Sequence, residues 1–213
     1  MKISLMTIWH CGNYGAEMQT YATVKALRKL RHDVEVLDFR LFESNHSLRS
    51  IVGRFLNAIT PAQRTFEKFW KKYIKNISCH YHNVAELRNN PPKSDVYLVG
   101  SDQVWNEDIT GDRSAAYLLD FGGENVKRIS YASSIGVSEW NFSQSYTEMA
   151  SKQFKKFVAL SCREITGANV LSQKFKLNVK QVLDPTLLHQ DYKEITGFIQ
   201  ETKKSCFLSF VGR

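Results

Sequence analysis

The first 39 residues alternate between strand-like and helix-like patterns, and this alternation restricts the fold more than any other feature. Residues 3–9 are a short apolar run without a helical period, which is typical of a buried strand. Residues 16–31 repeat apolar side chains at helical spacing, and residues 32–39 alternate apolar and polar side chains as a strand does. A strand, a helix and a strand within about 40 residues predict a βαβ unit, with parallel strands and a right-handed crossover.

The alternation continues along the chain. Further strands are expected at 95–100, 115–121, 126–134, 157–164 and 179–184, and helices at 47–59, 64–76, 143–157 and 165–175. This order predicts an α/β fold with a Rossmann-like, mostly parallel sheet flanked by helices. Ligands of such sheets bind beyond the carboxyl ends of the strands. The segments expected to border a site are therefore 10–15, 100–106, 132–136, 161–164 and 184–186.

The charge of the chain indicates which partners it favours. It has 213 residues with a net charge of +8, and such a balance attracts anionic partners. Much of the excess lies in residues 64–76, where Phe66, Phe69, Trp70 and Tyr73 recur at helical spacing between lysines. We interpret this segment as an amphipathic helix with its aromatic stripe in the core. Peripheral contact with an anionic membrane remains an alternative, whereas a nucleic-acid partner is not expected because stacking on bases needs exposed rings.

Cysteine usage and the N-terminus indicate the compartment. The four cysteines are far apart in the sequence and form no CxxC pair, so we expect reduced thiols. The N-terminal apolar run is too short for a signal peptide, and no stretch approaches the ~20 apolar residues of a membrane span. We therefore expect a cytoplasmic protein, with the inner face of the membrane as a second location.

A glycine-containing turn, "GNYG" at residues 12–15, separates the first strand from the first helix. Backbone N–H groups at a helix N-terminus bind anions, and glycine lets a ligand approach closely. Gly12, Asn13, Tyr14 and Gly15 are therefore candidate substrate-binding residues. The alternative is a plain strand–helix turn with Asn13 in a left-handed conformation.

A second segment, "GSDQVWN" at residues 100–106, is rich in hydrogen-bonding groups. Ser101, Gln103 and Asn106 are candidate substrate-binding residues, and Asp102 is a candidate general base. The alternative is a loop in which Ser101 or Asp102 caps a helix.

Two more segments follow predicted strands. "SCRE" at residues 161–164 places Arg163 at a strand end, and a guanidinium binds carboxylate or phosphate through two parallel hydrogen bonds. Arg163 is therefore a candidate catalytic residue and Glu164 a candidate substrate contact, with an ordinary salt bridge as the alternative. "LDPTLL" at residues 183–188 is interpreted as a structural corner fixed by Pro185. No metal site is expected, because His80 and His82 share a strand face without a third ligand nearby.

The ordered motifs together resemble the polysaccharide pyruvyl transferase family. These motifs are "GNYGAEMQTYATVKAL", "DVYLVGSDQVWN", "RISYASSIG", "LSCRE" and "VLDPTLL", and the resemblance covers residues 1 to about 190. It implies the N-terminal half of a GT-B-like architecture, in which two Rossmann-like domains face each other. Residues 1–190 would form the first domain, and 191–213 the linker and first strand of a second, largely absent domain.

The resemblance also implies an activity. Family members transfer a pyruvyl group from phosphoenolpyruvate to a sugar diol as a ketal, in the biosynthesis of cell-surface polysaccharides. The expected partners are phosphoenolpyruvate, as donor substrate, and a glycan or lipid-linked sugar acceptor, with no cofactor. The general acid is expected in the second domain, so this chain is expected to be incomplete by itself.

Two other functions stay open. A GT-B-type glycosyltransferase that uses a nucleotide-sugar would share the fold. A non-catalytic half would bind a partner, and the apolar strand expected at 203–213 could pair two copies into a homodimer.

Overall fold

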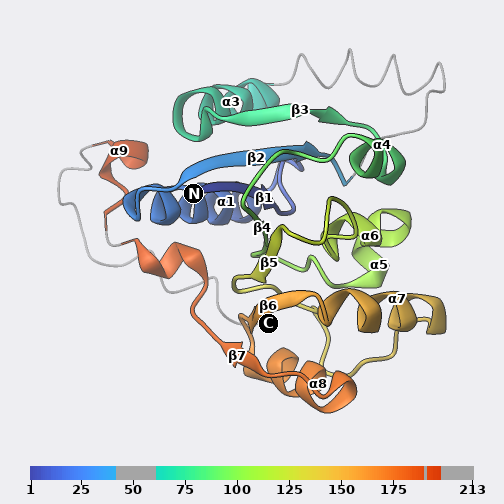
Figure 1. Cartoon of the computed structure of the whole chain (residues 1–213). Coiled ribbons are helices and arrows are strands. Elements are labelled where there is room, and N and C mark those ends of the chain that lie inside the picture. The colour runs from blue at the N-terminus through green and yellow to red at the C-terminus, as the bar shows by residue number, and fades with distance from the viewer. Residues whose placement is uncertain (42–60, 190, 198–213) are drawn as a thin grey trace.

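Seven parallel strands form one sheet at the centre of the protein (Figure 1). The computed structural model describes residues 1–41, 61–189 and 191–197. Across the sheet the strands lie in the order β3-β2-β1-β4-β5-β6-β7. They are β1 Lys2–Met6, β2 Asp33–Phe39, β3 Ile77–Tyr81, β4 Val96–Val99, β5 Lys127–Ser130, β6 Phe157–Cys162 and β7 Val179–Gln181. All pairs of neighbouring strands run parallel, as the sequence predicts.

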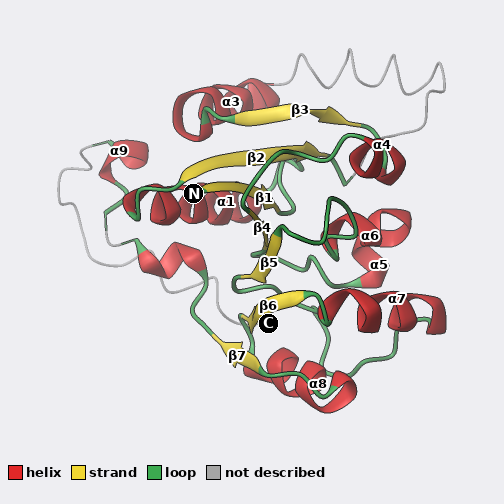
Figure 2. Ribbon diagram, viewed as in Figure 1, coloured by secondary structure: helices red, strands yellow, loops and turns green. Residues whose placement is uncertain are grey.

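Helices connect the strands (Figure 2). The α-helices are α1 Tyr14–Lys29, α3 Pro61–Phe69, α4 Val84–Asn89, α5 Glu107–Thr110, α6 Ser114–Tyr117, α7 Gln144–Phe154, α8 Ile165–Phe175 and α9 Lys193–Thr196. One π-helical turn, η1 Trp70–Ile74, and two 3-10 turns, η2 Gly111–Arg113 and η3 Pro185–Leu188, complete the described elements. The Rossmann-like α/β class expected from the sequence is confirmed.

The sheet separates two apolar cores. Successive side chains of a strand point to opposite faces, so β4 sends Val96 and Leu98 to one core and Tyr97 and Val99 to the other. The first core is closed by α1, α3 and η1, and the second by α4, α6, α7 and α8. This double burial explains why the strands read as nearly continuous apolar runs in the sequence.

The centre of the sheet is a topological switch point. β1 pairs with β2 on one side and with β4 on the other. From β1 the chain goes on to β2 and β3 toward one edge strand of the sheet, and from β4 it goes on to β5, β6 and β7 toward the other. The loops that leave β1 and β4 therefore separate at the carboxyl edge, where α/β sheets bind their ligands.

One predicted strand is wrong. Residues 115–121 form α6 and the turn after it, not a strand. Leu119 adopts a left-handed conformation (φ +55°), and the N–H of Asp120 bonds the Ala115 oxygen at 2.9 Å, which closes the helix end. The run from Ala115 to Leu119 is buried, and a short buried helix has the same apolar pattern as a buried strand.

The lysine-rich segment behaves as an amphipathic helix, as predicted. Phe66 and Trp70 are buried against the sheet, whereas Lys71, Lys72 and Lys75 are exposed. The sequence did not indicate that its last turn is a π-turn, in which the N–H of Lys75 bonds the Trp70 oxygen at 3.0 Å.

Two predicted elements, a helix at 47–59 and a strand at 203–213, lie outside the described residues. The described part of 191–213 contains α9, which contacts η1 through a hydrogen bond of 2.6 Å from the Tyr73 hydroxyl to the Glu194 backbone oxygen. The domain boundary near residue 190 stays a prediction. Among the described helices, none has the length and apolar character needed to cross a bilayer.

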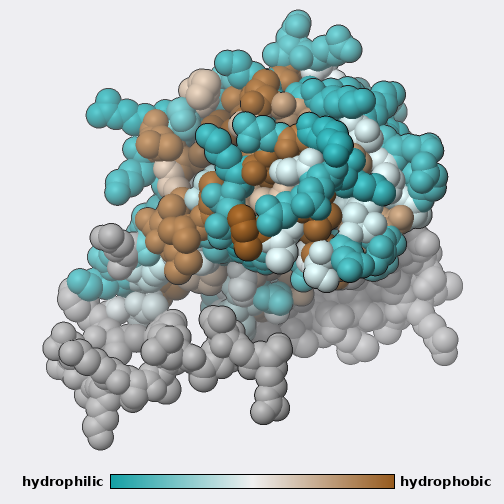
Figure 3. Space-filling view, turned by 90° about the horizontal axis from the view of Figure 1, so that it is seen from below, coloured by the Kyte–Doolittle hydropathy of each residue, from teal (hydrophilic) through white to brown (hydrophobic). Residues whose placement is uncertain are grey.

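Several large apolar side chains of the segment after β7 are exposed. Leu183, Leu187 and Leu188 are all largely exposed, and the space-filling view from below shows apolar surface between polar regions (Figure 3). The hydroxyl of Tyr131, after β5, donates to the Leu183 oxygen at 3.1 Å and holds this segment to the sheet.

We predict that Gly100→Ala strongly destabilises the protein. Gly100 has φ +128°, and a Cβ there would lie 2.0 Å from the backbone oxygen of Tyr131. Because backbone atoms cannot move aside cheaply, we expect a loss of more than about 2 kcal/mol in the free energy of unfolding, measured by urea denaturation. Gly123→Ala is the control, since a Cβ at Gly123 meets no atom within 4 Å. Equal stability of the two variants would contradict the prediction.

Candidate functional site

A cleft of about 300 Å³ opens at the switch point. It lies where the loops after β1 and β4 meet the ends of β6 and β7. Its lining residues are Asn13, Gly15, Ala16, Gln19, Asp102, Arg163, Asp184 and Thr186. Four of the predicted site residues, namely Asn13, Gly15, Asp102 and Arg163, are thus brought together from three distant segments.

The glycine turn begins α1 with an N-cap. Asn13 has an extended backbone (φ −106°), so the left-handed conformation considered for it is wrong, and Gly12 has the positive φ of +71° instead. The Asn13 side-chain oxygen accepts the N–H groups of Gly15 at 2.8 Å and Ala16 at 3.3 Å. The donors expected to bind an anion are therefore already bonded to Asn13. Tyr14 is exposed and packs on Phe66, with ring centroids 4.9 Å apart.

Glu17 is a buried carboxylate in the first turn of α1, and it binds the backbone just before the glycine turn. It accepts the indole N–H of Trp70 at 2.5 Å and the backbone N–H of His10 at 3.0 Å. Burial raises the pKa of Glu17 from 4.5 to about 7, although both hydrogen bonds act to lower it. His10 also stacks on Trp70, with ring centroids 3.9 Å apart. Glu17 therefore couples the turn to the lysine-rich segment.

Gln19 joins the two central loops. Its amide nitrogen donates to the Thr7 hydroxyl at 2.9 Å and to the Ile8 oxygen at 3.1 Å. Its amide oxygen accepts the N–H of Ser101 at 3.1 Å. This side chain fixes the loop after β1 relative to the loop after β4.

Asp102 borders the cleft in a left-handed conformation (φ +78°). One of its carboxylate oxygens accepts the N–H of Gln103 at 2.8 Å. It is half-buried and lies at the edge of the cleft, where a hydroxyl group could reach it. Its role as a general base stays a prediction.

Gln103 and Asn106 lie outside the cleft lining. Asn106 caps α5 by accepting the N–H of Asp108 at 3.1 Å, and it donates to the Gln103 side-chain oxygen at 2.9 Å. The helix cap considered for Ser101 or Asp102 is therefore supplied by Asn106. Trp105 is fully buried and donates its indole N–H to the Tyr117 oxygen at 3.3 Å, which makes it a core anchor.

Asp184 gathers four hydrogen bonds from three segments. It accepts the Ser101 hydroxyl at 3.0 Å, Arg163 Nη1 at 3.1 Å, and the N–H and hydroxyl of Thr186 at 2.9 and 2.6 Å. Burial acts to raise the pKa of Asp184, but these hydrogen bonds outweigh it and hold the pKa below its usual value. The sequence predicted a structural corner for residues 183–188, and Asp184 was not among the predicted site residues.

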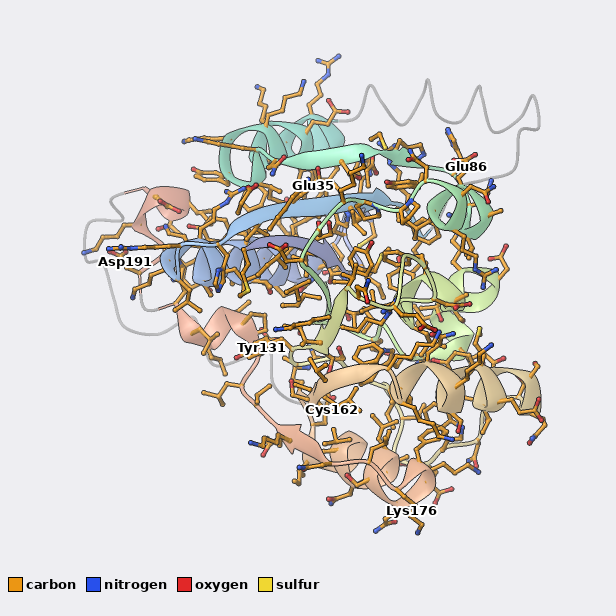
Figure 4. The ribbon with its side chains drawn as sticks, viewed as in Figure 1. Glu35, Glu86, Tyr131, Cys162, Lys176 and Asp191 are labelled. Atoms are coloured by element: carbon orange, nitrogen blue, oxygen red, sulfur yellow. The ribbon has the colours of Figure 1, made fainter. Side chains whose placement is uncertain are left out.

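Arg163 follows Cys162, which ends β6 near the middle of the view in Figure 4. Its Nε donates to Glu164 at 2.8 Å and its Nη1 to Asp184 at 3.1 Å. Burial acts to lower the pKa of Arg163, but the two carboxylates raise it overall. The salt bridge considered as the alternative is therefore present. Among the described residues, no hydrogen bond engages Nη2, so the guanidinium retains a donor for a ligand.

The described lining of the cleft carries more negative than positive charge. Arg163 is the one cation among the described lining residues, and it faces Asp102 and Asp184. A donor with two anionic groups would need further positive charge from elsewhere. Among the described residues, no group of three His, Cys, Asp or Glu side chains is placed to hold a metal, and His80 Nδ1 lies 3.2 Å from an Asp38 oxygen.

Hydrogen bonds of Ser101, Gln19, Asp184 and Thr186 hold the segments around the cleft together. Ser101 is fully buried, and its hydroxyl bonds Asp184. Its predicted contact with substrate stays a prediction, as does that of Glu164, whose side chain bonds Arg163. The sequence reading missed Gln19 and Thr186. The only available signal was that Thr186 lies in a segment expected beyond a strand end.

We predict that Glu17→Gln gains stability relative to the wild type as the pH rises. A buried carboxylate with a raised pKa contributes stability while protonated, and this contribution is lost between the unfolded value of 4.5 and about 7. Glutamine never ionises, and its single carbonyl oxygen keeps one of the two acceptor bonds, so the loss of the other bond is a constant cost that does not depend on pH. We expect the variant to gain up to ~3 kcal/mol relative to the wild type between about pH 5 and pH 8, measured by urea denaturation. A difference independent of pH would contradict it.

We predict the opposite pH dependence for Asp184→Asn. A depressed carboxyl pKa contributes stability above the unfolded value, and this is lost as the pH falls through the folded value. The variant should lose ~1–3 kcal/mol of unfolding free energy at about pH 7, because Arg163 loses its charged partner. The loss should shrink at about pH 3, as measured by the same denaturation assay. A constant loss at both pH values would rule out the ionised carboxylate as its cause.

The comparisons with known proteins gave one family match. The sequence model of the polysaccharide pyruvyl transferase family matches residues 13–206. Searches of curated proteins and of solved structures found no match. The family match begins at the N-cap of α1 and includes the described loops after β4, β6 and β7 that border the cleft. The chain therefore belongs to the polysaccharide pyruvyl transferase family.

Proposed function

We propose that this protein transfers a pyruvyl group from phosphoenolpyruvate to a sugar diol, and that the cleft at the switch point takes part in donor binding. Membership of the family carries the proposal. The position of the cleft supports it, because α/β sheets bind ligands at this edge. Arg163 supports it further, since its guanidinium borders the cleft and keeps one nitrogen available.

The proposed reaction begins with a proton that adds to the methylene carbon of phosphoenolpyruvate. The neighbouring carbon becomes electron-deficient, and one sugar hydroxyl attacks it. The bond from this carbon to the phosphate oxygen then breaks, and the second hydroxyl closes the ketal. Of the two diol protons, one balances the new methyl group and the other leaves with phosphate.

Two residues have proposed roles in these steps. Arg163 binds the carboxylate or the phosphate of the donor through its free nitrogen, and Asp184 holds the guanidinium in place. Asp102 accepts a proton from an attacking hydroxyl. The cation count of the cleft is low for a donor with two anionic groups, so we propose that further cations and the general acid come from a second domain. We also propose a cytoplasmic location, with the acceptor a glycan or a lipid-linked sugar in cell-surface polysaccharide synthesis.

We predict that phosphoenolpyruvate binds the chain and that Arg163→Ala weakens this binding at least about tenfold, the effect expected for one charge-assisted contact. Isothermal titration calorimetry measures the affinity. Arg88→Ala is the matched control, because Arg88 is an exposed arginine whose ion pair with Asp120 lies on α4, away from the cleft. Arg163→Lys keeps the charge but loses the planar donors, so it should give an intermediate affinity.

A titration with a nucleotide-sugar and an assay of phosphate release distinguish the other functions. Binding of a nucleotide-sugar, without binding of phosphoenolpyruvate, would favour a glycosyltransferase. For the complete protein, release of phosphate from phosphoenolpyruvate should depend on a glycan acceptor. Failure to release phosphate with any of a broad panel of acceptors would favour a non-catalytic binding role.

A further inference from the structure

A second hollow, of about 380 Å³, lies at the other end of α1 from the cleft. It is bordered by the last turns of α1, by η1 and by the segment that contains α9, and we call it the basic hollow. Its cations are Lys25, Arg28, Lys29, Lys72 and Lys75. The helix is about 24 Å long, and the cleft uses residues of its N-terminal half, such as Gln19, whereas the hollow uses Tyr21 and the residues that follow.

The walls of the basic hollow are fixed by bonds to the main chain. Arg28 donates to the Ile74 oxygen at 2.6 Å and to the Tyr73 oxygen at 3.4 Å, which joins α1 to η1. The π-turn of η1 places Lys72 with its Nζ 4.8 Å from the centre of the Tyr73 ring. Lys25 and Lys72 therefore border the hollow from elements that are held together.

Most of its cations have no acidic partner among the described residues. No described carboxylate forms an ion pair with Lys29, Lys72 or Lys75, and Arg28 binds backbone oxygens. A basic end of α1 is explained in part by the helix dipole, which favours cations at a C-terminus. The dipole does not explain Lys72 and Lys75, which come from η1 and converge on the same hollow.

The hollow already binds one anionic group. The Glu194 carboxylate of α9 contacts the Lys25 ammonium and the Tyr21 hydroxyl, and Lys25 Nζ lies 2.9 Å from that hydroxyl. The chain thus shows the chemistry that an anion would meet here. Asp191, at the left of the view in Figure 4, lies in an adjoining hollow that shares Lys25 and Lys29. The cations outnumber these two carboxylates.

His189 reports the positive potential of the basic hollow. It lines the basic hollow, and its Nε2 is buried without a hydrogen-bond partner among the described residues. Burial lowers the pKa of His189, and the charges of Lys25 and Lys29 lower it further, as expected where the potential is positive.

We propose that the basic hollow binds the phosphate groups of a phosphorylated ligand, at a site separate from the cleft. Several lysines around an aromatic wall suit the dispersed charge of a diphosphate, since each ammonium binds as a point charge. Either a soluble phosphorylated compound or the headgroup of an anionic lipid has this chemistry. The proposal does not depend on the pyruvyl transfer reaction.

Titration of the full chain with inorganic pyrophosphate tests the proposal. We expect saturable binding, weakened about tenfold in the double variant Lys29→Gln/Lys72→Gln through the loss of two charges. Glu194→Gln should bind more tightly, because a competing carboxylate is removed. The double variant Lys155→Gln/Lys156→Gln is the control, since it removes the same charge from exposed positions just after α7.

The outcomes separate this proposal from the others. Absence of saturable binding, or equal weakening by the control pair, would overturn it. Loss of binding in Arg163→Ala would assign pyrophosphate to the cleft and would also overturn it. Unchanged binding in that variant supports a separate site, whatever its effect on phosphoenolpyruvate.

A vesicle assay identifies the source of the phosphate. The ligand is a lipid headgroup if the chain binds phosphatidylglycerol vesicles, loses this binding in the Lys29→Gln/Lys72→Gln variant, and does not bind phosphatidylcholine vesicles. If pyrophosphate binds and neither vesicle does, the ligand is a soluble phosphorylated compound. Both results support a phosphate site and differ only in where the phosphate comes from.

Discussion

The ionised carboxylate of Asp184 is the interaction on which the cleft depends. It joins Ser101 after β4, Arg163 after β6 and Thr186 in η3, which are separated by tens of residues in the sequence. A half-buried carboxylate with this many donors is stabilised in its charged form. The guanidinium of Arg163 is oriented by the same bond. Removing the carboxylate would therefore disturb the position of a candidate catalytic group as well as the fold.

The two ends of α1 have different chemistry because the helix is polar along its axis. Its N-terminus is satisfied by Asn13 and lies at the carboxyl edge of the sheet, beside Asp102 and Arg163. Its C-terminus is basic and reaches the opposite edge, beside η1. The cations behind the net charge of +8 therefore lie mainly away from the cleft, whose lining has one guanidinium and two carboxylates. This distribution would not follow from composition.

Local patterns predicted much of the fold, and long-range contacts explain what they missed. The helix expected at 165–175 has those bounds in the structure, and the parallel sheet follows from the βαβ order. The strand expected at 115–121 failed because a buried helical turn has the same apolar pattern. The expectation that ligands bind beyond the carboxyl ends of the strands correctly selected Asn13, Asp102 and Arg163 as residues near one cleft. Gln19 and Asp184 were missed because their partners are 82 and 83 residues away, and no local spacing encodes such pairs.

Arg28 holds the lysine-rich segment by its main chain. Its guanidinium binds the backbone oxygens of Tyr73, Ile74 and Val34, which are present whatever side chains those positions carry. During sequence divergence, the side chains at 71, 72 and 75 can therefore change without releasing the segment from α1. The packing of this segment on α1 therefore does not depend on its surface side chains. Related chains can carry different surface charges here on the same backbone.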